Sequence, residues 1–157
     1  MRAVLVCLAG FVLATNLHAD STRPVDIPTR AKGADRVVVA TIADVNASFA
    51  TTEHGDQIIV SQVTLMIEDN LKGGSREAML SVDVEGGTVG DLTLEVSDMP
   101  SVHQGERAVF FLRRSAEGKH VPHLRGQGII KLQSDDSVHG TSLTLDAIRS
   151  MVRGAQQ

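Results

Sequence analysis

The sequence has little cysteine, aromatic residue or proline, and no long apolar run. Its only cysteine, Cys7, lies in an apolar stretch near the N-terminus, so the rest of the chain can form no disulfide and offers no cysteine nucleophile. Trp and Tyr are absent and there are only four Phe, so the chain lacks the rings on which single-stranded nucleic acids stack. No apolar run reaches the roughly 20 residues of a membrane-spanning helix. The formal charge of −4 argues against nucleic-acid partners and anionic membrane surfaces.

Residues 1–19 have the three parts of a secretory signal peptide. Arg2 supplies a positive start, residues 3–14 are uncharged and apolar, and a more polar stretch ends in the small residue Ala19. We expect cleavage near Ala19 and export to the periplasm or the extracellular space. Cys7 lies inside the apolar stretch rather than at the cleavage site, which argues against a lipid anchor. A buried N-terminal helix or strand is the alternative interpretation of this stretch.

Cleavage after residue 19 would leave a mildly acidic chain of one domain. It removes Arg2 and no acid, so the remaining 138 residues carry 14 Lys and Arg against 19 Asp and Glu, a formal charge of −5. That length suits a single hydrophobic core. Residues 20–33 contain Pro24 and Pro28 and few apolar residues, which predicts an extended or disordered lead-in. Residues 34–154 are expected to form the domain.

Alternating apolar residues, together with the continuous apolar runs at 36–42 and 108–112, predict strands in most of this domain. The segments are 36–42, 58–68, 78–84, 92–96, 108–112, 120–124 and 128–132, with loops at 51–57, 85–90 and 97–105. The alternation places Leu65, Leu80 and Phe110 on inner faces and Thr64 and Glu95 on outer faces. A slip of one residue would exchange the two sets.

Only the C-terminal end has helical spacing. Thr144 is a suitable N-cap, Asp146 falls in the first turn and Gly154 follows the last. The apolar side of this amphipathic helix consists of Leu145, Ile148, Met151 and Val152. Several short strands and one closing helix predict an all-β fold: a small OB-like β-barrel of five to seven short strands with one C-terminal amphipathic helix.

Several short motifs recur in a familiar order. They are residues 34–42, Leu71-Lys72-Gly73, Gly86-Gly87, Gly105-Glu106-Arg107 leading into residues 109–112, and Gly126-Gln127-Gly128. In this order the chain resembles bacterial secreted OB-like domains related to netrin modules and tissue inhibitors of metalloproteinases, over residues 34–132. The resemblance implies a barrel that binds other proteins, so a secreted or envelope protein, a protease included, is the expected partner.

The chain departs from those inhibitors at the feature that performs inhibition. In the family, a mature N-terminal cysteine held by disulfides chelates the protease zinc through its amine and carbonyl. Here the mature chain is expected to start at Asp20 and to contain no cysteine. No inhibitory residue of the family can therefore be assigned to a position of this sequence.

His120 and His123 are the only pair of closely spaced histidines. Residues three apart in a strand point to opposite faces, so the pair is poorly placed to share a zinc ion, although Pro122 could bend the chain between them. We therefore predict no metal, no cofactor and no enzymatic activity. A small metal-dependent hydrolase using His120, His123 and a carboxylate such as Asp135 is the alternative.

The leading functional hypothesis is an exported, non-enzymatic binding or accessory module that recognises a protein or peptide in the cell envelope. Its surface would be formed by the loops 51–57, 85–90 and 97–105, because loops on a rigid barrel can vary without disturbing the core. Met99 and His103 are the first side chains expected to contact a partner. A structural envelope component, in which these loops only connect strands, is a further alternative.

Overall fold

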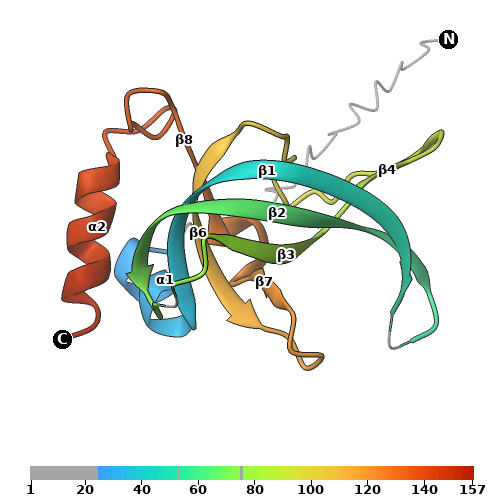
Figure 1. Ribbon diagram of the computed structural model, residues 1–157, viewed down its shortest axis with the longest axis horizontal. Coiled ribbons are helices and arrows are strands. Elements are labelled where there is room, and N and C mark those ends of the chain that lie inside the picture. Colours follow the sequence, from blue (N-terminus) through green and yellow to red (C-terminus); the bar gives the residue numbers. More distant parts are fainter. Residues whose placement is uncertain (1–24, 53, 75) are drawn as a thin grey trace, which may run out of the picture.

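A computed structural model describes residues 25–157 except 53 and 75, and Figure 1 shows its arrangement. The signal peptide predicted at residues 1–19 lies outside these residues. The elements in chain order are α1 (Ile27–Gly33), β1 (Arg36–Thr51), β2 (Gln57–Lys72), β3 (Met79–Glu85), β4 (Gly87–Val89), β5 (Leu92–Leu94), β6 (Arg107–Arg114), β7 (His120–Pro122), the 3-10 helix η1 (Arg125–Gly128), β8 (Ile129–Leu132) and α2 (Leu145–Gly154).

Five of the strands close into a barrel-like ring. The ring runs β1–β2–β3–β7–β6 and back to β1, with β8 added along the first half of β6. All ladders in it are antiparallel except the single parallel pairing of Val82 with His120. The predicted OB-like barrel with a C-terminal helix is thus confirmed. However, β1 and β2 are 16 residues each rather than short, and register shifts along β1 allow it to curve around the ring.

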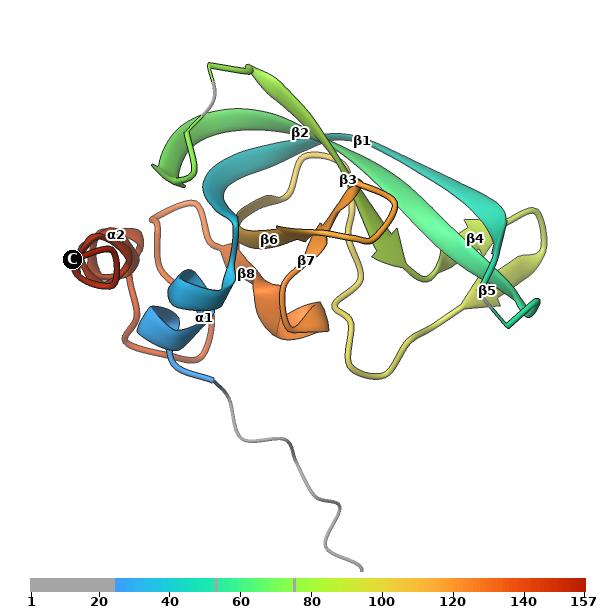
Figure 2. The same ribbon diagram turned by 90° about the horizontal axis from the view of Figure 1, so that it is seen from below.

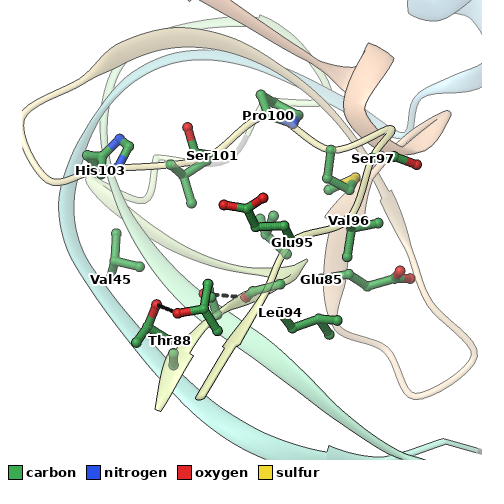
Figure 3. Close-up of a pocket in the computed structure, with 18 of the residues that line it drawn as sticks. Val45, Glu85, Thr88, Leu94, Glu95, Val96, Ser97, Pro100, Ser101 and His103 are labelled. Atoms are coloured by element: carbon green, nitrogen blue, oxygen red, sulfur yellow. Dashed lines mark hydrogen bonds between the residues drawn. The ribbon is translucent and has the colours of Figure 1, made fainter. Parts of the chain in front are cut away.

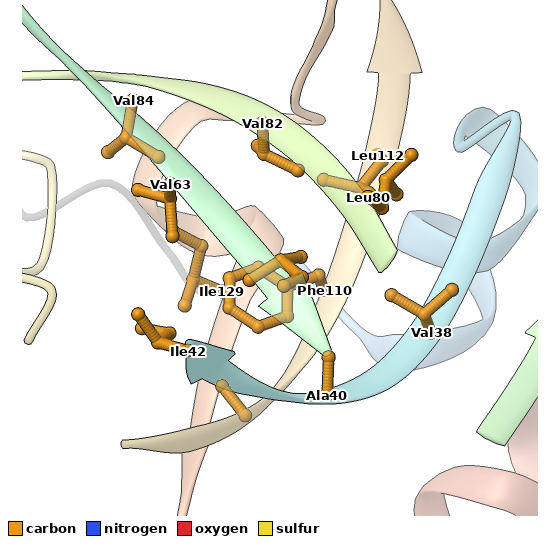
Figure 4. Close-up of a cluster of buried hydrophobic side chains, with 12 residues drawn as sticks. Val38, Ala40, Ile42, Val63, Leu80, Val82, Val84, Phe110, Leu112 and Ile129 are labelled. Carbon is orange, nitrogen blue, oxygen red and sulfur yellow. The ribbon is translucent and has the colours of Figure 1, made fainter. Parts of the chain in front are cut away.

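The interior of the ring is an apolar core with the predicted register. Leu65 and Phe110 are fully buried and Leu80 is 7% exposed, whereas Glu95 is exposed. Figure 4 shows side chains from β1, β2, β3, β6 and β8 meeting in this core. Its buried members are Val38, Ala40, Ile42, Val63, Leu65, Leu80, Val82, Val84, Ala108, Phe110, Leu112 and Ile129.

A second core lies outside the ring, between its β1–β6–β8 wall and the two α-helices. Val37, Val39, Val109 and Phe111 point outward from the ring, yet all four are fully buried. The helices that cover them contribute Ile27, Ala31, Leu145, Ile148 and Val152. Since β1 and β6 are buried on both faces here, their sequences are continuous apolar runs instead of alternating ones.

Helix α1 corrects the prediction that residues 20–33 form an extended or disordered lead-in; residues 20–24 lie outside the described part. Asp26 caps the helix by accepting a hydrogen bond from the Thr29 N–H at 2.7 Å, and Pro28 sits in the first turn. Low apolar content and two prolines suggest an extended segment here, but a hydrogen-bond acceptor such as Asp26 followed by Pro28 is also a helix-start signal.

Two further predictions change. The strand expected at residues 92–96 with one buried face is only Leu92–Leu94, and the Leu92 side chain is 61% exposed. The pair β4–β5 forms a separate small hairpin instead of part of the ring.

Among the described helices, none is both long enough and apolar enough to cross a membrane.

Candidate functional site

The β1–β2 hairpin continues past β6 as an arm, formed by β1 from Asp44 onward and the residues of β2 that pair with it, and only the end of this arm is two-stranded. The β1–β6 ladder ends at Thr41, and the last backbone bonds on that edge of β1 join Ile42 to Glu106 and Gly105, both at 2.8 Å. The other neighbour, β3, ends opposite Val60. In Figure 2 the arm reaches the end of the molecule opposite α2, where the β4–β5 hairpin lies beside it.

A groove of about 800 Å³ opens between this arm, the β4–β5 hairpin and the chain that returns to β6. Its lining residues are Val45 and Ala47 from β1, Ser61 and Val84 from the adjacent strands, residues 85–88 and 93–97 from the hairpin, and residues 99–104 from the returning chain. Two of the three predicted binding loops, 85–90 and 97–105, therefore line one groove, as Figure 3 shows. The third, 51–57, lies at the tip of the arm.

Close packing between the β4–β5 hairpin and the arm shapes the groove floor. Gly87 has φ +132°, and a Cβ at that position would lie 2.4 Å from Ser61 Oγ and 3.0 Å from Ala47 Cβ. The Ser61 hydroxyl, itself buried, donates to the Gly86 carbonyl at 2.7 Å. Glycine at position 87 thus allows the hairpin backbone to approach the arm closely.

The charge inside the groove is acidic. Among the described residues, Glu95 makes no hydrogen bond or ion pair, and Figure 3 shows its carboxylate amid the lining side chains. Glu85 differs because Arg125 Nη2 binds its carboxylate at 2.9 Å and also binds Asp98 at 3.0 Å. The hydrogen bond from Arg125 lowers the pKa of Asp98, so this cluster stays ionised and internally paired. Glu95 is consequently the acid available to a ligand.

The two side chains predicted to contact a partner both line the groove, but in different ways. Met99 is partly buried and packs against the ring core, so it serves the fold as well as the groove. The expectation that this loop can vary without disturbing the core is therefore wrong at Met99. The His103 side chain is 67% exposed, and its Nδ1 lies 3.3 Å from Glu106 Oε1.

Glu106 holds the base of the returning chain in place. Its carboxylate accepts bonds from Lys131 Nζ at 2.8 Å and from the His103 backbone N–H at 3.0 Å. Burial by itself would raise the pKa of Glu106, but these hydrogen bonds offset it and lower the pKa below its usual value. The loop that carries His103 is therefore fixed to β8 through an ionised carboxylate.

A second concavity, of about 730 Å³, lies on the outer face of the same arm. It is bordered by Ser48, Val60 and Asp83 from the sheet and by the β6–β7 turn. Lys119 Nζ from that turn binds Asp83 at 3.0 Å. Its charged residues are largely paired, which makes it a less distinctive binding surface than the groove.

The structure does not bring together the residues of the hydrolase alternative. His120 pairs with Arg114 at one end of β6, whereas Asp135 follows Leu132, which pairs with Arg107 at the other end. Seven residues of strand separate those two ends, about 23 Å. Asp135 instead bonds with Ser137 in its own turn. In the described part of the chain, no three His, Cys, Asp or Glu side chains gather as metal ligands.

The two histidines lie in different surroundings. Burial, followed by repulsion from Arg114, lowers the pKa of His120, and burial followed by Arg113 lowers that of His123. The His123 ring packs against Gly33 of α1, where an added Cβ would lie 2.4 Å from its Nε2. Its role is thus contact between α1 and the ring.

Sequence reasoning found the loops of the groove but missed part of its wall. Val45 and Ala47 carry no sequence signal of a binding site, and the alternation assigns Glu95 only to an outer face. Periodicity indicates which face of a strand is exposed to solvent, but it does not show which exposed faces lie next to one another in the fold. In the comparisons with known proteins, no family model matches the chain and the search of curated proteins returns no match.

Proposed function

We propose that the chain is an exported, non-enzymatic binding module that takes a segment of another polypeptide, in the cell envelope, into the groove beside the arm. The observation that carries this proposal is the acidic, partly apolar groove whose one unpaired acid, Glu95, faces its interior. Its volume falls within the range of about 300–1,000 Å³ that is usual for ligand sites.

The lining favours a ligand with both apolar and basic side chains. Val45, Leu94 and Val102 supply apolar contacts, and they belong to three separate segments of the chain. Glu95 would pair with a lysine or arginine of the ligand, because opposite charge across an interface directs which partner binds. The resemblance to protein-binding OB-like domains and the predicted signal peptide support the same proposal.

The proposal is tested with peptides selected from a displayed random library on the purified mature protein. We expect selected peptides to contain basic residues and to lose about 1.5- to fivefold in affinity for Glu95→Gln, the effect of one exposed ion pair. His103→Ala should also weaken binding. Glu117→Gln is the matched control, because Glu117 is an exposed glutamate that borders the other concavity.

Two results would overturn the proposal. One is a library selection that yields no peptide above background. The other is a set of peptides whose affinity is the same for the wild type, Glu95→Gln and His103→Ala. A thermal midpoint is measured for each variant, and we expect it to stay unchanged for Glu95→Gln because Glu95 is exposed and pairs with no described residue.

A further inference from the structure

The arm has a free strand edge along the groove. Gly86 N–H donates to the Ile59 carbonyl at 2.9 Å, so the backbone groups of Ile59 point toward β3 and away from β1. Its direct partner on β1 is Phe49. In an antiparallel pair both residues bond each other or neither does, so Phe49 directs its N–H and C=O away from β2.

The alternation extends this result along the arm. Ala47 and Val45 are two and four residues before Phe49, with partners two and four residues after Ile59, so their backbone groups also point outward. The register shift between Ile42 and Asp44 places Ile42 opposite Leu65, two residues after the Val63 partner of Val45, so Ile42 also points outward, and its N–H and C=O bond to Glu106 and Gly105. Beyond Ile42 the described chain supplies no further backbone partner on this edge, since residues 99–104 turn away to form the groove wall.

We infer that the ligand binds as an added strand on this β1 edge. It would run antiparallel to β1 and continue the line of β6 past Gly105, beyond the point where the β1–β6 ladder stops. The inference rests on the proposed function and specifies its ligand as an extended polypeptide segment. Main-chain bonds to Val45, Ala47 and Phe49 supply sequence-independent affinity. Alternate side chains enter the groove, where Glu95 selects a basic residue.

The sequence of the edge is consistent with such a role. Residues 45–50 contain no charge and no proline, the features that usually protect an exposed edge against pairing. Val45 and Ala47 nevertheless lie within the groove, between the β4–β5 hairpin and the returning chain. A second copy would present its own residues 45–50, which offer Glu95 no basic side chain, whereas a basic segment of a partner protein supplies one. The occupant is therefore a peptide segment of a partner protein.

Amide hydrogen exchange of the mature protein, with and without a library-selected peptide, tests the inference. We expect the amides of Val45, Ala47 and Phe49 to become protected when the peptide binds. Asn46 and Ser48 lie between them and bond to β2 in both states, so they serve as internal controls. Selective protection at every second residue is the signature of an added strand.

Backbone N-methylation of the same peptide gives a second readout. Methylation at alternate positions should weaken binding roughly two- to tenfold for each donor removed, and methylation of the intervening positions should not. Peptides that are sensitive to Glu95→Gln but show neither pattern would overturn strand addition while leaving the proposed function standing. Absence of any bound peptide would overturn both. Concentration-dependent protection of these amides in the free protein would identify a second copy as the occupant and also overturn the inference.

Discussion

Substitution of Lys72 by methionine should release helix α1 from the barrel. Lys72 Nζ lies 2.8 Å from the Ala31 carbonyl, 2.7 Å from that of Ala34 and 3.2 Å from that of Lys32. These carbonyls lie at the C-terminal end of α1, where a cation also favours the helix dipole. A hydrogen bond to a charged group contributes about 1.5–3 kcal/mol. We expect a total loss in that range, because the three acceptors share one ammonium and water can replace part of it.

Urea denaturation measures this loss, and Lys32→Met is the matched control. Lys32 lies on the same helix with an exposed side chain, so its loss should be limited to a dipole effect of about 0.3–1 kcal/mol. Native-state hydrogen exchange should also show faster opening of residues 27–33 in Lys72→Met. Equal midpoints for the two variants would refute the role of Lys72.

Three other predictions follow from the fold and the N-terminus. Leu65→Ala should lower the free energy of unfolding by about 2–5 kcal/mol in urea denaturation, since Leu65 is fully buried. Met66→Ala, at a position 51% exposed on the same strand, should lower it by less than about 1 kcal/mol. Equal losses would mean that the assigned register of this strand is wrong. Burial and the charge of Arg113 lower the pKa of His123 in the folded protein below its unfolded value of about 6.5. The stability that this group contributes is therefore present above the unfolded pKa and is lost as the pH falls through the folded-state pKa. His123→Gln should therefore flatten the pH dependence of stability in that window, and an unchanged profile would contradict the burial argument. Protein recovered outside the cytoplasm should begin at Asp20 by mass analysis, and an intact full-length chain there would contradict cleavage.

The ring was predictable because its strands carry one of two local patterns. Leu65 and Leu80 belong to alternating strands with a single buried face, whereas Phe110 belongs to a short continuous apolar run that is buried on both faces. The C-terminal helix could also be predicted, because ten residues are enough to show apolar residues at helical spacing together with an N-cap at Thr144. In the structure the Thr144 hydroxyl accepts a hydrogen bond from the Ala147 N–H.

Helix α1 was not predicted because its stability comes from distant residues. Seven residues are too few to display an amphipathic repeat, and such a short helix is marginal in isolation. Arg30 Nη1 binds the Gln127 carbonyl at 2.7 Å, and Lys72 caps the far end of the helix. Both partners come from segments remote in sequence, so apart from the Asp26 and Pro28 start signal no local pattern indicates the helix.

The groove was only half predictable for a related reason. Its loops could be recognised because glycine, proline and polar residues interrupt the strand pattern between residues 85 and 105. The opposite wall belongs to an ordinary strand, β1, and Val45 and Glu95 line the same groove because Gly87 allows the hairpin to lie against the arm. Tertiary packing, rather than any local preference, creates the site.

The two halves of β1 show why the free edge lies where it does. Residues 36–42 form an almost continuous apolar run because helices and ring bury both faces, and neighbouring strands occupy both edges. Residues 44–51 return to alternation, with Val45 and Ala47 half-buried between exposed Asp44, Asn46 and Ser48. This change of pattern within one strand marks the point where the β1–β6 ladder ends and the second edge of β1 becomes unpaired. Since that edge needs no partner for the fold, its backbone groups are the ones available for a ligand.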